Sequence, residues 1–408
     1  MFGVLFLKEC KQTLKCSTYY IILACLLFFY MTQFGDIQMI KKPEPNQQDY
    51  GMTYSKDERV IMESTLQSMI NEYVTNSYVT YPTGFYKEIT LNEEKQSKIF
   101  DIILKIIGLE KEELKAALDK YSADSQATLD KLNLTVADDM KYERFMKLMK
   151  QADKLLGGGS KYSEANIRHN AYVSMTYEDA LQEYNEIMQK DHLTGAYARL
   201  FCDYMGIILA ILPVFLAVVR TLRDKRAGTS QTIYSKSASS INIVLSRYLY
   251  IVVMLMLPVL LIAAYATLEC IYIGSSQGVK VDIFAFFNYS CFWLLPSVMI
   301  SASVGILLTE LTETAIAIVV MAIWWFTSLF MGAVDINGDY GWNLIPRHNS
   351  LGNYQLFHDN LGILLINRLS YAMLAILLAV ATVWVYDLKR KGKLGFYGRK
   401  ISNIKSKS

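Results

Sequence analysis

The sequence predicts a mainly α-helical, polytopic membrane protein with six transmembrane helices and a large, mostly helical extracellular domain between the first and second spans. Hydrophobic residues make up 52% of the 408 residues and are concentrated in six long runs with few or no charges. Runs of about 20 apolar residues match the ~30 Å hydrocarbon core of a bilayer. The uneven distribution of lysine and arginine along the chain orients these spans.

The first 35 residues contain two predicted elements. Residues 1–16 begin apolar and end basic, which favours an amphipathic helix on the cytoplasmic membrane surface. The alternative is that they simply begin the first span, which we place at 17–35. A cleaved signal peptide would also be apolar, but no clear small-x-small cleavage site follows this run, so a retained span is favoured.

Residues 36–197 form the predicted extracellular helical domain. Apolar residues recur at helical spacing in 56–79, in the segment after the N-cap candidate Asn92, in 138–156 and in 177–190. The block has no cysteine, so its own core must hold it together. The glycine-rich run at 157–161 lacks the Walker A spacing, and we interpret it as a helix-terminating turn.

The remaining spans follow a second apolar run. Transmembrane helix 2 is predicted at 198–220 and includes Pro213, which can kink a membrane helix. A cytoplasmic loop follows at 221–246, transmembrane helices 3–6 occupy 247–387, and a basic cytoplasmic tail covers 388–408. Between the last two spans, the stretch from Trp342 to Gly352 contains the helix breaker Pro346. This stretch is either partly re-entrant or a plain extracellular loop.

Basic residues predict which side of the membrane each loop faces. Lysine and arginine are abundant before the first span, in the loop at 221–246 and in the tail, whereas the short loops on the other side carry few, such as Lys280 and Arg347. Cytoplasmic loops carry this excess, so both termini are predicted to be cytoplasmic. The tail lysines can also bind anionic membrane lipids. A net charge of only +3 gives no support to nucleic acid binding.

No motif for catalysis, nucleotide binding or metal binding is recognisable. The sequence therefore predicts neither an enzyme nor a cofactor or metal site in this chain. Intramembrane charges would indicate an ion path, but only Asp203, Glu269 and Glu310 come close to the spans. We interpret them as hydrated interfacial side chains, which makes an ion-coupled carrier the weakest transport hypothesis.

The loop between the second and third spans carries the most specific pattern. Residues 220–247 read RTLRDKRAGTSQTIYSKSASSINIVLSR, with six bases and one acid. With the amphipathic start LFLKECKQTLK and the predicted topology, this stretch resembles the permease subunits of ABC-2-type ABC exporters. That family commonly has an acidic residue and arginine, then Gly-Thr, then a basic residue opening the next span. Five residues occupy these places, although DKR departs from the usual Glu-Arg pairing: Asp224, Arg226, Gly228, Thr229 and Arg247.

The resemblance implies a type V exporter-like fold, with two identical or paralogous permease chains in a bacterial plasma membrane. Each chain would dock on a separate ABC ATPase subunit that binds ATP, and a peptide, lipid-like molecule, antibiotic or ion would be moved outward. The segment 224–240 would include the coupling helix. A membrane sensor or assembly factor, whose outer domain binds an envelope ligand, is the alternative function. The ATPase-coupling candidates are Asp224, Lys225, Arg226, Gly228, Thr229, Tyr234 and Arg247.

Overall fold

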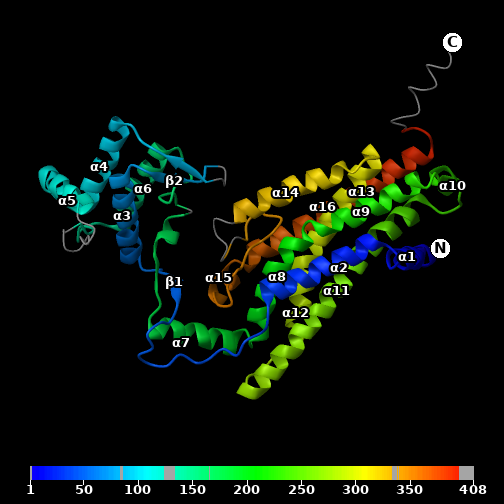
Figure 1. Cartoon of the computed structure of the whole chain (residues 1–408), viewed down its shortest axis with the longest axis horizontal. Coiled ribbons are helices and arrows are strands. Elements are labelled where there is room, and N and C mark those ends of the chain that lie inside the picture. Colours follow the sequence, from blue (N-terminus) through cyan, green and yellow to red (C-terminus); the bar gives the residue numbers. More distant parts are fainter. Residues whose placement is uncertain are drawn as a thin grey trace, which may run out of the picture. The chain divides into compact units, whose positions relative to one another are not determined.

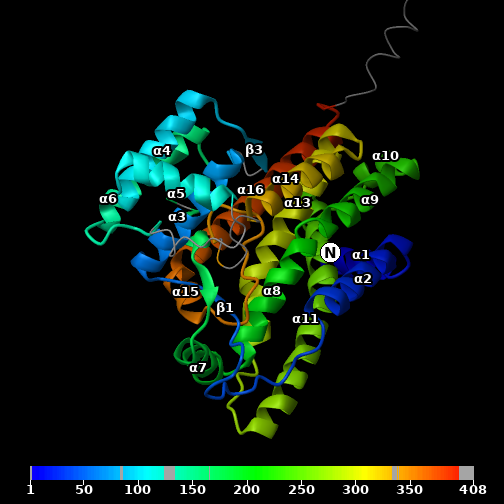
Figure 2. The same ribbon diagram turned by 60° about the vertical axis from the view of Figure 1, so that its left-hand side comes forward.

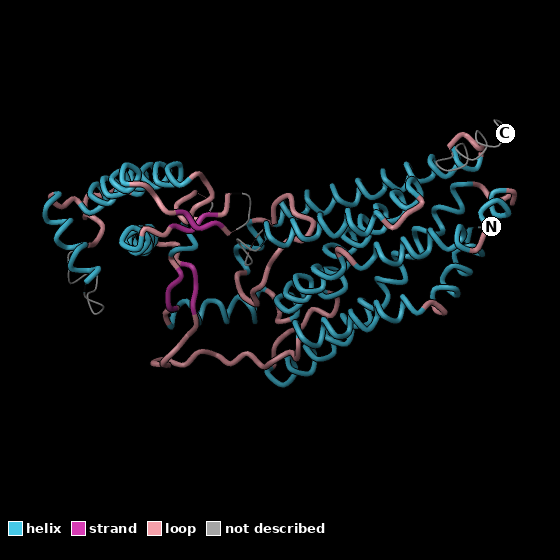
Figure 3. Tube along the Cα trace, turned by 45° about the horizontal axis from the view of Figure 1, so that its top comes forward, coloured by secondary structure: helices cyan, strands magenta, loops and turns pink. Residues whose placement is uncertain are grey.

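A computed structural model describes residues 2–82, 86–123, 134–164, 166–332, 338 and 340–394. The chain divides into two compact units, one made of Met1–Lys42 and Gln182–Ser408, the other of Pro43–Leu181. Each unit has a hydrophobic core of its own. The described regular structure is almost entirely helical, and the short strands, drawn in magenta in Figure 3, all belong to the unit Pro43–Leu181.

The first unit, Met1–Lys42 with Gln182–Ser408, contains long apolar helices that run side by side (Figure 1). Short π-helical turns extend three of its helical segments, at Tyr30–Phe34, Glu186–Lys190 and Ser290–Leu294. The α-helices are α1 (Phe2–Thr13), α2 (Ser17–Phe29), α8 (Thr194–Leu209), α9 (Leu212–Arg226), α10 (Ser230–Tyr234), α11 (Ser240–Gln277), α12 (Ala285–Tyr289), α13 (Leu295–Thr312), α14 (Ile316–Gly332), α15 (Tyr354–Asp359) and α16 (Leu361–Arg390), with α7 (Tyr177–Asn185) leading into the unit.

Among the described residues, five helical stretches are long and apolar enough to cross a membrane, and they confirm the polytopic class. A sixth apolar helix, Ile316–Met331, is shorter, so six spans and their sidedness stay predictions. Helix ends differ from the predicted bounds because capping, and not hydropathy, sets them. Ser239 accepts a hydrogen bond from the backbone N–H of Asn242 and starts α11 at Ser240. The five stretches are Ser17–Phe34, Thr194–Arg226, Ser240–Gln277, Ala285–Thr312 and Leu361–Arg390.

The second long stretch is broken near its middle, just before Pro213, the residue that can kink a membrane helix. The α-helix stops after Leu209 and resumes at Leu212, with the proline in the first turn of α9. Proline is tolerated there because the first-turn N–H groups have no acceptor within the helix. Pro258, by contrast, lies inside the continuous helix α11.

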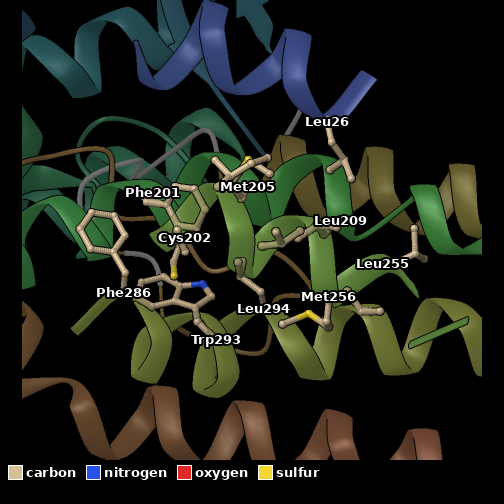
Figure 4. Packing of buried hydrophobic residues seen from close by; sticks show 14 of the residues in the cluster. Leu26, Phe201, Cys202, Met205, Leu209, Leu255, Met256, Phe286, Trp293 and Leu294 are labelled. Atoms are coloured by element: carbon tan, nitrogen blue, oxygen red, sulfur yellow. The ribbon is translucent and has the colours of Figure 1, made fainter. Parts of the chain in front are cut away.

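The core of this first unit is packed around α8, α11 and α13. Figure 4 shows the sulfur of Cys202 in α8 beside the aromatic ring of Trp293. Phe201, also in α8, meets the ring of Phe286 edge-on with centroids 5.6 Å apart, and all four residues are fully buried. α13 packs against α9, α14 and α16, and these helices run together in Figures 1 and 2. Close approach of α13 to α9 requires Gly305, where a Cβ would lie 2.7 Å from the Cβ of Ala217.

The stretch between α14 and α15 is buried without being helical. Residues 343–348 are all buried, and both sequence interpretations, a partly re-entrant stretch and a plain extracellular loop, stay predictions. Arg368 of α16, 1% exposed, holds this stretch through its guanidinium group. That group donates hydrogen bonds to the carbonyl oxygens of Asn343 at 3.1 Å and Leu344 at 3.3 Å. A re-entrant segment would be enclosed in this way.

Two predictions about single charged residues are wrong. Asp203, interpreted as a hydrated interfacial side chain, is fully buried and accepts hydrogen bonds from Arg347 at 2.9 and 3.1 Å. Arg347 is itself buried in this pair. Glu310 is 8% exposed, with Lys389 Nζ 3.8 Å away. Hydropathy misses such pairs because each neutralising partner comes from a distant part of the chain.

The C-terminal tail begins later than the predicted boundary at 388. α16 runs to Arg390, so the first residues assigned to the tail belong to the last helix. Residues 395–408, which hold three of the six lysines of the predicted tail, lie outside the described residues.

The second unit, Pro43–Leu181, is mainly helical as predicted, but α5 and the strands were not foreseen. Asn92 caps α4 as predicted, accepting a hydrogen bond from the backbone N–H of Lys95 at 3.1 Å. The three glycines after α6 all have positive φ, which ends the helix. The elements are α3 (Glu58–Thr75), α4 (Glu93–Ile107), α5 (Lys111–Ala123), α6 (Tyr142–Leu156), and the antiparallel pairs β1 (Met52–Tyr54) with β4 (Tyr172–Ser174) and β2 (Tyr78–Thr80) with β3 (Lys87–Ile89).

Candidate functional site at the α9–α11 loop

The loop between α9 and α11 is a tight turn followed by one short helix. Gly228 has φ +64°, a left-handed conformation that glycine adopts without steric cost. Thr229 then donates two hydrogen bonds to the carbonyl oxygen of Asp224, from its backbone N–H at 3.0 Å and from Oγ1 at 3.2 Å. The end of α9 is thus closed, and α10 (Ser230–Tyr234) follows directly (Figure 1).

A chain of buried ion pairs connects this loop to α1 and α11. The carboxylate of Asp224 accepts a hydrogen bond from Arg247 of α11 and lies 3.1 Å from Arg220. Arg220 in turn makes a two-pronged pair with Glu9 of α1, and Arg223 Nη2 lies 3.1 Å from the same carboxylate. Because an isolated buried charge is costly, these pairs fix the three helices in one arrangement.

A second set of ion pairs connects the end of α9 to α13 and α16. Lys225 Nζ lies 2.6 Å from Glu313, and Lys389 Nζ of α16 lies 2.9 Å from the other oxygen of that carboxylate. Glu313 has φ +56°, which is unfavourable for a residue with a side chain. The two lysines hold it there. A pocket of about 220 Å³ lies among these groups.

Arg390, in the last turn of α16, holds the short helix α10 in place. Its guanidinium group donates to the carbonyl oxygens of Tyr234 at 2.9 Å, Ala238 at 2.6 Å and Lys236 at 2.5 Å. The ring of Tyr234 meets the edge of the Tyr386 ring, with centroids 5.5 Å apart. The loop is therefore fastened to the C-terminal helix through its own backbone.

The structure divides the seven coupling candidates into two groups. Asp224, Arg247 and Tyr234 are at least half-buried and belong to the network, whereas Lys225 is exposed but reaches Glu313. The others form an exposed tip, made of Arg226, Gly228 and Thr229.

Sequence reasoning missed Glu9, Arg220, Glu313 and Arg390. One available signal was the spacing of Arg220 and Asp224, which places both on one helix face. The acid at position 9, within an otherwise apolar and basic start, was another. Neither signal showed which distant charged residues form ion pairs with each other.

The pH dependence of the network follows from the pKa of Glu313, which lies below its usual value of 4.5. The hydrogen bond from Lys225 is the main cause, burial opposes it, and Lys389 adds to the lowering. A depressed carboxyl pKa contributes stability above the unfolded pKa, and this contribution is lost as pH falls through the folded pKa. We expect Glu313→Gln to lower the melting temperature of the purified chain at neutral pH. The difference from wild type should begin to shrink as pH falls below the unfolded carboxyl pKa of about 4.3 and should vanish once pH is below the lower folded pKa. A difference that persists at low pH would contradict this assignment.

The long apolar helices and paired buried charges define an α-helical, multi-pass membrane protein. Within the described parts of the chain, no three His, Cys, Asp or Glu side chains are grouped to hold a metal ion. A family model described as "ABC-2 family transporter protein" matches residues 16–342. The chain therefore belongs to the ABC-2 transporter family. No curated protein and no solved structure matches it.

Family membership gives the general function of the chain. It is a membrane permease component of an ABC transporter, and permeases of this family generally work with an ATPase subunit and are not generally catalytic themselves. The matched range includes the unit Pro43–Leu181, to which the sequence motifs had assigned no family.

Proposed function

We propose that this chain is the transmembrane subunit of an ATP-driven exporter, and that its ATPase docks on the α9–α11 loop. The observation that carries the proposal is the combination of an exposed loop tip with the ion-pair network behind it. The tip residues Gly228 and Thr229 are exposed, so a partner could contact them. The network joins the loop to α1, α11, α13 and α16. A displacement of the tip would therefore move these helices together as a rigid body.

The proposed topology has six spans with both termini in the cytoplasm. α14 is the sixth span, and the excess of basic residues on the side of the α9–α11 loop places that loop inside. The unit Pro43–Leu181 then lies outside. A second permease chain, identical or paralogous, completes the pathway in a bacterial plasma membrane. The cargo is a peptide, a lipid-like molecule, an antibiotic or an ion, moved outward with ATP hydrolysed by the partner subunit.

Two glycine substitutions, one in the α9–α11 loop and one at the C-terminal end of α11, test the docking site. Gly228 and Gly278 have φ of +64° and +66°, and a Cβ on either would have no atom within 4 Å. Gly228→Trp and Gly278→Trp therefore impose the same local strain. We expect Gly228→Trp to reduce co-purification of the ATPase and ATP-dependent export, and Gly278→Trp to leave both near wild type. The proposal is wrong if the native chain brings down no ATPase and Gly228→Trp exports normally.

A membrane sensor or assembly factor is the second candidate function. The observation that favours it is the separate core of the unit Pro43–Leu181, which would support ligand recognition independently of the helical bundle. Reconstitution of both subunits in proteoliposomes distinguishes the two functions. ATP-dependent movement of a substrate would rule out sensing as the sole role, and ligand-dependent signalling without movement would favour it.

A further inference from the structure

A groove in the unit Pro43–Leu181 is unexplained by the proposed export mechanism. It lies between α4 and α6, with a volume of about 440 Å³. Both helices are amphipathic and bury their apolar faces in the core of the unit, so the groove is formed by side chains at the edges of these faces. Its walls contain four lysines and one acid, and the lining residues are Lys95, Lys98, Asp101, Ile102, Lys105, Gln151, Lys154 and Leu155.

The groove is positively charged, whereas the unit as a whole has a net negative charge. Residues 43–181 contain 23 acidic and 17 basic residues, so a random patch of this surface would be acidic. Four lysines in one concave site bring like charges together, which is unfavourable until an anion is bound. The lysines of the groove are therefore not a consequence of a generally basic surface.

Two of the four lysines, Lys95 and Lys98, have partners within the described part of the unit, and the other two do not. Lys95 donates to the carbonyl oxygen of Leu155 at 3.1 Å, and Lys98 pairs with Glu94 at 2.6 Å. Lys105 and Lys154 are exposed, and neither makes an ion pair or a side-chain hydrogen bond within the described part of the chain. Lys105 lies on the α4 wall of the groove and Lys154 on the α6 wall, so each wall offers one ammonium group that is unpaired among the described residues.

The residue types and their spacing indicate the kind of anion. Lysine acts as a point charge with three donors and commonly binds phosphate groups, whereas the two-pronged fork of arginine binds carboxylates and phosphates alike. The groove has lysines and no arginine, which suits the oxygens of a phosphate group. Lys95 and Lys105 are ten residues apart on α4, about 15 Å along the helix axis, which is too far for one phosphate to contact both.

We propose that the α4–α6 groove binds a linear chain that carries several phosphate groups. A concave site between two helices admits such a chain, whereas a flat bilayer surface cannot enter it. The inference rests on the proposed function only in placing this unit outside the cell, where the phosphate chain would be an envelope component. Binding itself requires neither ATP nor transport, so its failure and the failure of the export proposal are distinguishable.

The experiment measures binding of a fluorescent short linear polyphosphate to the full chain in nanodiscs of neutral phosphatidylcholine. The test variant is Lys105→Gln/Lys154→Gln, and the conservative variant is Lys105→Arg/Lys154→Arg. The matched control is Lys115→Gln/Lys120→Gln, which removes two exposed lysines of α5 that do not line the groove. The basic cytoplasmic segments are the same in all four proteins, so their contribution cancels in the comparison.

We expect the test variant to bind polyphosphate about 2- to 25-fold more weakly than wild type, since each of the two exposed pairs contributes up to about fivefold. The arginine variant and the α5 control should bind as wild type does, and added salt should weaken the groove-dependent part. Equal binding by wild type and the test variant would overturn the proposal. So would competition by polyglutamate as strong as that by polyphosphate, or lysine-dependent binding seen only with phosphatidylglycerol vesicles.

Discussion

Replacing Arg368 by methionine is expected to destabilise the helical bundle by about 3–5 kcal/mol, one of the two largest effects foreseen for a single substitution. The guanidinium group also donates to the Trp293 carbonyl at 3.2 Å and to Ser297 Oγ at 2.9 Å. With the carbonyls of Asn343 and Leu344, it satisfies acceptors on the π-helical turn Ser290–Leu294, on α13 and on the buried stretch before α15. Methionine fills similar space but leaves these buried acceptors without a donor. A buried acceptor with no donor has lost its hydrogen bond to water without replacement, and this raises the free energy of the folded state.

Thermal unfolding of the purified chain in detergent measures this effect. Arg368→Lys keeps the charge but cannot reach all of these acceptors, so an intermediate melting temperature is expected. Arg144→Met, which removes an exposed arginine of α6, is the control and should melt as wild type does. Limited proteolysis should cut Arg368→Met between 340 and 352, because the stretch loses its anchor. A wild-type melting temperature for Arg368→Met would show that the bonds to Arg368 contribute nothing to stability.

Arg368 also shows what the sequence could predict about this fold. Long runs of apolar residues revealed the membrane helices because burial in lipid imposes composition over about 20 consecutive residues. By the same criterion of apolar composition, Arg368 was only a charged residue near the edge of the last span. Its function as an anchor depends on carbonyl groups of residues 293, 343 and 344, and backbone acceptors leave no mark in a sequence.

The candidate site was predictable in part for a related reason. The turn at Gly228 and the spacing of Asp224 and Arg226 are local patterns, and local patterns survive in sequence. The partners of that loop, Glu9 and Glu313, lie 211 residues before Arg220 and 88 residues after Lys225. A single sequence holds no information on which distant charges pair, so the network became visible only in three dimensions.

Glu9→Gln is expected to weaken both the stability of the bundle and the coupling of the loop to α1. The introduced glutamine would be close in shape to the native glutamate but uncharged, and Arg220, 6% exposed, would keep only Asp224, which it shares with Arg247. Removing one partner of a buried ion pair typically costs about 3–5 kcal/mol. The pKa of Glu9 is consistent with a charged carboxylate: burial raises it, but Arg220, Arg247 and Arg223 outweigh burial and lower it.

A double-mutant cycle separates the ion pair from other effects of the substitution. Glu9→Gln/Arg220→Met removes both charges, so it should be less destabilised than the sum of the two single variants. Lys8→Gln, at the exposed neighbouring position of α1, should leave the melting temperature unchanged. Additive single and double variants would contradict a direct pair between the two side chains.

The transport consequence of Glu9→Gln follows from the position of Arg220 in the network. Arg220 is the group through which α1 contacts the chain of charges that ends at Arg247 of α11. If the ATPase acts on the loop tip, loss of this link should lower export per ATP hydrolysed at temperatures where the variant remains folded. Lys8→Gln should export as wild type does. Unchanged export per ATP in folded Glu9→Gln would show that α1 stabilises the bundle without taking part in coupling.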